Sequence, residues 1–89
     1  MDLSSVSGFN EIIVLTPKRL EEGLEAIIAV RERRTVLINL SEMEPQLAQR
    51  TADFISGGVF ALKGHERRVG ERVLLFAPAG VDIDKLNPD

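Results

Sequence analysis

Residues 10–40 read NEIIVLTPKRLEEGLEAIIAVRERRTVLINL, and this segment gives the clearest evidence of the fold class. It begins and ends with short apolar runs, Ile12–Leu15 and Val36–Leu40, which are typical of buried strands. Between them, Thr16 suits a helix N-cap and Pro17 suits the first helical position. Apolar side chains then recur at helical spacing, at Leu20, Leu24, Ile27 and Ile28. A strand, a helix and a second strand within about 30 residues form a βαβ unit, whose strands are parallel and whose crossover is right-handed.

A second helix is predicted from Pro45 to about Lys63. Pro45 fits its first turn without loss of a hydrogen bond. One broad, mostly apolar face follows at Leu47, Ala48, Thr51, Ala52, Phe54, Ile55, Val59 and Leu62. Gly57 and Gly58 interrupt this face, and each costs about 1 kcal/mol relative to Ala inside a helix. Because the apolar spacing continues beyond them, we expect one uninterrupted helix with Gly64 as its C-cap.

The remaining third of the chain predicts a hairpin. Gly70 followed by Glu71 suits the two central positions of a type II′ turn. We therefore expect strands near His65–Val69 and Arg72–Ala77, and a short edge strand at Val81–Ile83. The predicted fold is α/β, a two-layer sandwich in which two helices cover one face of a four- to five-stranded mixed sheet.

The strands raise a question about the second face of this sheet. Ile12–Leu15, Val36–Ile38 and Val73–Phe76 are apolar at every position, whereas adjacent side chains of a strand point to opposite faces. Continuous apolar strands indicate burial on both faces. We expect another copy of the chain, or a partner, to cover the second face. The alternative is that the end strands curl and the C-terminal tail folds over it.

Composition excludes several functional classes. The chain has 89 residues, 44% of them hydrophobic and 28% charged, which is ordinary for one small globular domain. Its net charge of −3 argues against a general nucleic-acid-binding protein. It has no Cys, and no apolar run approaches the roughly 20 residues of a membrane span. Residues 1–9 are predicted to be the stub of a linker and residues 10–89 the folded domain.

No pattern of residues indicates an enzyme. His65, the one histidine, has no orienting or nucleophilic partner at a telling spacing. Ser56 with the glycines that follow lacks the G-x-S-x-G pattern, and those glycines are not a phosphate-binding loop. Glu42 and Glu44 are expected to be a solvated turn. We predict no catalytic residue, no cofactor and no metal.

Three features are candidates for binding surfaces. The cations of residues 31–34, RERR, are explained by their place at the end of a helix, where positive charge is favoured. Arg67, Arg68 and Arg72 flank the apolar strand of the hairpin, a composition that protein interfaces favour. A solvated edge of the sheet is the alternative. Gly57 and Ala61 lie four residues apart on one helical face, where a second helix could approach closely. Close packing of this face on its own sheet is the alternative.

Three segments, in this order and spacing, resemble the core domain of SepF, a bacterial cell-division family. They are RR-x-V-x-x-N-L at 33–40, A-Q-R-x-x-D-F-x-S-G at 48–57 and V-x-L-F-x-P at 73–78. The residues that carry the match are Arg33, Arg34, Asn39, Leu40, Ala48, Gln49, Arg50, Asp53, Phe54, Ser56, Gly57, Phe76 and Pro78. The resemblance covers about residues 10–83.

The resemblance implies an adaptor of the division machinery. SepF-like proteins bind the C-terminal tail of FtsZ, form dimers and polymers, and tether the Z ring to the inner face of the membrane at the septum. It implies tail binding at Arg68 and Leu74 and self-association at Gly57, to which the spacing of small residues adds Ala61. The family's membrane anchor is an N-terminal amphipathic helix, and residues 1–10 show no such pattern. The competing hypothesis is a small α/β nucleic-acid-binding module, which the acidic charge and the lack of Tyr and Trp disfavour.

Overall fold

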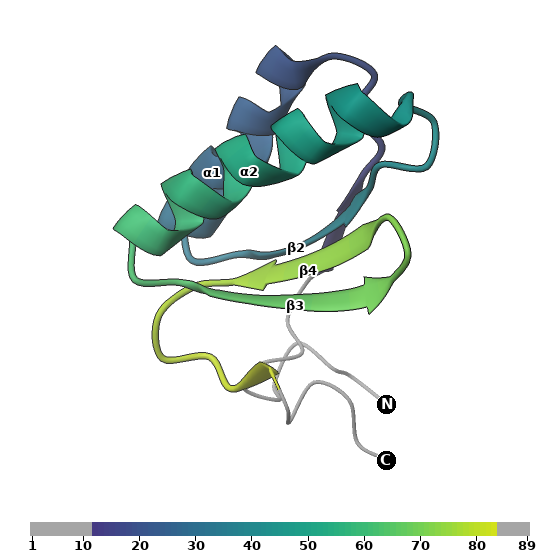
Figure 1. The fold of residues 1–89 in the computed structure, drawn as a ribbon. Helices are drawn as coiled ribbons and strands as arrows, with labels where there is room; N and C mark the ends of the chain where they lie inside the picture. The colour runs from purple at the N-terminus through teal and green to yellow at the C-terminus, as the bar shows by residue number, and fades with distance from the viewer. Residues whose placement is uncertain (1–11, 84–89) are drawn as a thin grey trace.

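The computed structural model describes residues 12–83, so the predicted linker stub at residues 1–9 lies outside the described residues. Four strands form one mixed sheet in the order β1-β2-β4-β3. The strands are β1 (Ile12–Leu15), β2 (Thr35–Asn39), β3 (His65–Gly70) and β4 (Val73–Ala77). Helices α1 (Gly23–Arg31) and α2 (Pro45–Ala61) lie side by side on one face of the sheet (Figure 1). The predicted two-layer α/β fold is therefore confirmed.

The βαβ unit is confirmed in its strands and corrected at the start of its helix. β1 pairs in parallel with β2, with Ile12 opposite Thr35 and Leu15 opposite Ile38. Thr16 and Pro17, however, lie outside any helix. The helical segment begins with a 3-10 turn, η2 (Leu20–Glu22), which leads directly into α1.

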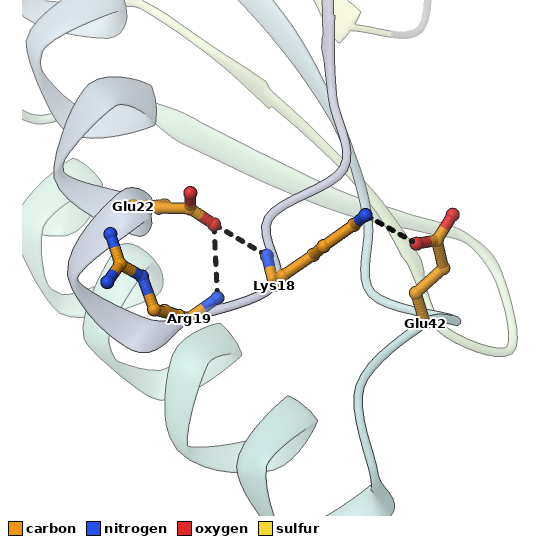
Figure 2. Close-up of polar contacts among 4 residues, drawn as sticks. All are labelled: Lys18, Arg19, Glu22 and Glu42. Atoms are coloured by element: carbon orange, nitrogen blue, oxygen red, sulfur yellow. Dashed lines mark hydrogen bonds and ion pairs between the residues drawn. The ribbon is translucent and has the colours of Figure 1, made fainter.

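The carboxylate of Glu22 explains this later start. Its Oε1 accepts hydrogen bonds from the backbone N–H groups of Lys18 at 2.6 Å and Arg19 at 3.1 Å (Figure 2). These two backbone bonds, that from Lys18 first, lower the pKa of Glu22. A side chain inside the first turn thus caps the segment, where the sequence predicted a cap at Thr16. Lys18 Nζ also lies 3.9 Å from Glu42 Oε1.

α2 runs without a break through Gly57 and Gly58, as predicted, but its end differs from the prediction. Lys63, not Gly64, takes the left-handed conformation, with φ of +63°. The N–H of Lys63 donates to the carbonyl of Phe60 and that of Gly64 to Val59, both at 2.9 Å, which is a Schellman motif. Gly64 is required for a different reason: a Cβ there would lie 2.7 Å from the carbonyl oxygen of Ala77.

The hairpin is shifted by one residue from the predicted turn. β3 extends to Gly70, which pairs with Val73, so the loop consists of Glu71 and Arg72. An irregularity between Arg68 and Gly70 absorbs the extra residue. The bulge brings Arg68 directly opposite Leu74. The additional strand predicted at Val81–Ile83 is absent, because these residues lie outside any strand.

The hydrophobic core lies between the sheet and the helices. Its largest fully buried members are Phe76 and Ile38 from the sheet, with Ile55, Val30 and Val59 from the helices. The side chains between these buried strand residues point to the other face of the sheet, which we call the open face. At Gly58, a Cβ would lie 2.4 Å from Ile27 Cδ1, so α1 and α2 approach each other through this glycine.

Within residues 12–83, no helix covers the open face. Val14 is 61% and Ile12 45% exposed, and Leu37 and Leu75, which pair with each other, are half-buried. Residues 78–83 follow β4 and lie beside β3, where residues 80–83 and 65–67 line a common pocket (Figure 1). Apolar side chains of β1, β2 and β4 remain accessible on the open face.

Candidate functional site

A groove lies between the β3–β4 hairpin and the first half of α2. It encloses a volume of about 270 Å³. The hairpin wall consists of Arg68, Glu71, Arg72 and Leu74, and the other wall of Leu40, Pro45, Ala48, Gln49 and Ala52. The groove therefore joins segments from the middle and the end of the chain.

The two residues predicted for partner binding lie together in this groove. Arg68 and Leu74 are directly opposite each other on adjacent strands, so their side chains share the helix-facing side of the sheet. Leu74 is 6% exposed and contributes to the apolar floor with Ala48, whereas Arg68 is exposed at the rim. An apolar floor beside a cation suits a short peptide that carries one apolar side chain and one carboxylate.

The wall from α2 is the part of the groove that sequence reasoning missed. Ala48 and Ala52 are four residues apart, so both lie on one side of the helix and leave space above Leu74. Gln49 stands beside them and donates a hydrogen bond from Nε2 to Asp53 Oδ1 at 2.9 Å. Two alanines four residues apart are visible in the sequence as a small-residue face of the helix. That this face lines a groove follows only from its position opposite the hairpin.

The residues predicted for self-association lie elsewhere, on the outward face of α2. Gly57 and Ala61 are both exposed. A Cβ at Gly57 would meet no other atom within 4 Å, in contrast to Gly58. Packing of α2 within its own chain therefore does not require Gly57. Phe60, on the same outward face, is 81% exposed, which is unusual for a large aromatic side chain.

Other polar groups do not converge on a reactive centre. His65 is exposed at the first position of β3. Within residues 12–83, no group of three or more His, Asp or Glu side chains is placed to hold a metal ion. Neither helix of this range has the length and apolar character that crossing a bilayer requires. The arrangement of the described residues suits recognition of another chain.

Residues 12–83 form a small two-layer α/β domain with a groove between its hairpin and α2. The family described as Cell division protein SepF matches residues 12–83. Two curated relatives of that name, from Synechococcus elongatus and Trichodesmium erythraeum, are 47% and 46% identical over 91% and 89% of this chain. The chain belongs to the SepF family of cell-division proteins.

The matched relatives are longer than this chain, which spans 42% and 38% of their lengths. Among solved structures, the SepF-like protein from Archaeoglobus fulgidus has the same fold, with a TM-score of 0.63. That match covers 79% of this chain and 87% of the archaeal one at 19% sequence identity. The fold is therefore shared well beyond the range of close sequence similarity.

Proposed function

We propose that this domain is a non-enzymatic adaptor that binds the C-terminal tail of FtsZ and self-associates, so that it tethers and organises the Z ring at the septum. The observation that carries the proposal is the groove in which Arg68 stands directly opposite Leu74. We assign no membrane contact to this domain itself; an N-terminal amphipathic anchor of the kind that the SepF family carries would supply attachment at the cytoplasmic face.

Charge reversal at Arg68 tests tail binding. Because Arg68 is exposed, Arg68→Glu should fold normally and weaken binding of a labelled FtsZ-tail peptide about tenfold or more, measured by fluorescence anisotropy. The loss should be larger at low salt. Arg31→Glu is the matched control, since Arg31 is an exposed arginine at the end of α1, outside the groove.

Leu74 gives a second, less direct test. It is buried, so Leu74→Ala would remove core packing as well as the groove floor. Leu74→Met keeps the volume and changes the shape of the floor.

Equal affinity of Arg68→Glu and the unmodified protein for the peptide, with unchanged circular dichroism, would show that the tail binds elsewhere.

Self-association is proposed to use two surfaces. The first is the open face, where exposed Ile12 and Val14 lie beside half-buried Leu37 and Leu75. The second is the outward face of α2, with Gly57, Ala61 and the exposed Phe60. Contacts on opposite sides of one molecule would allow a dimer to extend into a polymer.

Each surface can be disrupted separately by one substitution, and multi-angle light scattering measures the mass of the resulting assembly. Val14→Glu places a charge on the open face, whereas Gly57→Lys places a long side chain into empty space on α2. Both variants should stay folded, and each should abolish one step of assembly. Parent and variants of identical mass at every concentration would contradict the proposal for the altered surface.

A further inference from the structure

The groove contains two arginines four residues apart, and the structure gives them different tasks. Arg68 is exposed at the rim. Arg72 is half-buried, and its Nη1 already donates a hydrogen bond to the backbone carbonyl of Met43 at 3.1 Å. The backbone carbonyl of Arg72 accepts a second bond, from the N–H of Leu40 at 2.8 Å.

These two bonds connect the walls of the groove. Arg72 belongs to the hairpin loop, and residues 40–43 lead directly into α2 at Pro45. Leu40 and Met43 are 2% and 4% exposed, so the segment that Arg72 holds is itself fixed in the core. The width of the groove between the hairpin and the start of α2 is therefore set at Arg72.

We propose that Arg72 is a positioning residue that holds the groove in its binding shape, and that Arg68 alone pairs with a carboxylate of the bound peptide. This inference rests on the proposed function of the groove. Two charges support the division of tasks. One N–H of the Arg72 guanidinium is already bonded to the carbonyl of Met43, and the neighbouring acidic residue of the same wall, Glu71, offsets the positive charge at that end of the groove.

The division also fixes the chemistry of the ligand. A single carboxylate lies at the Arg68 end, and an apolar side chain rests over Leu74, Ala48 and Ala52. A preformed groove lowers the ordering cost of binding, so loosening it weakens the binding of every peptide, charged or not. Loss of a ligand-pairing cation weakens only the binding of peptides that carry the carboxylate.

A double-mutant cycle separates the two tasks. The 89-residue chain and its variants Arg68→Met and Arg72→Met are each titrated with an FtsZ-tail peptide and with a matched peptide whose carboxylates are amides. We expect Arg68→Met to bind the charged peptide about tenfold more weakly and the amide peptide unchanged, with a reduced salt dependence. Arg72→Met should bind both peptides several-fold more weakly, and its salt dependence should fall less than that of Arg68→Met.

Arg72→Lys is a second variant at this position, in case Arg72→Met does not fold. It keeps the positive charge but replaces the planar guanidinium that reaches Met43, so it should also bind both peptides more weakly. Full affinity in Arg72→Lys or Arg72→Met would overturn the inference. So would coupling of Arg72 to the peptide carboxylate as strong as that of Arg68. If the unmodified chain binds neither peptide, the proposed function of the groove fails instead.

Discussion

The two faces of the sheet are built from similar residues and differ in what covers them. Ile38 and Leu37 are neighbours in β2, yet Ile38 is fully buried beneath the helices and Leu37 is half-buried on the open face. Val14, in β1, is 61% exposed on that same face. An unbroken apolar strand therefore predicts that both faces of the sheet are buried. It does not predict which face is buried by the same chain and which by another molecule.

Removing core packing from each face gives the largest expected contrast. Ile38→Ala should lower the free energy of unfolding by about 3–4 kcal/mol, because it leaves a cavity among fixed neighbours. Leu37→Ala, where the environment is open on one side, should lower it by about 1 kcal/mol. Urea denaturation at low protein concentration measures both. Equal losses there would mean that a single chain already covers both faces.

The same contrast exists within α2, between adjacent glycines. Gly58→Ala should cost about 1–3 kcal/mol, since the new Cβ would lie 2.4 Å from Ile27 Cδ1. Gly57→Ala meets empty space and should raise the free energy of unfolding by up to about 1 kcal/mol through helix propensity. Thermal unfolding followed by circular dichroism compares the pair. A stabilised Gly58→Ala would show that Ile27 adjusts without cost.

The covered face also contains one unsatisfied polar atom. Thr51 is fully buried, and its Oγ1 has no hydrogen-bond partner. Thr51→Val keeps the branched shape and removes this hydroxyl, so it should raise the free energy of unfolding by about 1 kcal/mol. Thr51→Ser, which retains the hydroxyl and loses a methyl group, is the control and should be destabilising. A less stable Thr51→Val would indicate that the hydroxyl has a partner in solution.

The smallest effect is expected where the chain enters the helix layer, at Glu22. Its folded-state pKa lies below the ordinary value of 4.5, so its capping bonds stabilise the fold above that pH and are lost as the pH falls through the lowered pKa. Glu22→Gln removes this dependence. In denaturation midpoints taken over an acidic pH series, the parent should lose slightly more stability than Glu22→Gln. Identical pH profiles would argue against the cap.

Much of the fold could be predicted because its signals are local. The βαβ unit and the hairpin each lie in one continuous stretch with clear apolar spacing. Two of the errors lie at helix ends: Glu22 displaces the expected cap at Thr16, and Lys63 takes the left-handed conformation expected at Gly64. Short-range hydrogen bonds of this kind leave no periodic trace in the sequence.

The candidate site was half predictable for a related reason. Arg68 and Leu74 are brought together by the hairpin, whose pairing the sequence indicates within one residue. The opposite wall depends on where the hairpin holds the segment that leads into α2, through contacts such as that of Arg72 with Met43. Likewise, nothing in the dipeptide Gly57-Gly58 tells which glycine faces inward. The position of Ile27, thirty residues earlier in the sequence, decides it.

The strand order has a consequence for the chain during its synthesis. β2 pairs with β1, which is made before it, and with β4, which is made about 40 residues after it. Val36 of β2 pairs with Phe76 of β4. At a translation rate of about 5–20 residues per second, Phe76 is made several seconds after Val36. Through that time the nascent chain carries an apolar strand with one unpaired edge, the kind of segment that associates with other chains. Chaperone demand should therefore concentrate in this interval and end when the hairpin closes the sheet.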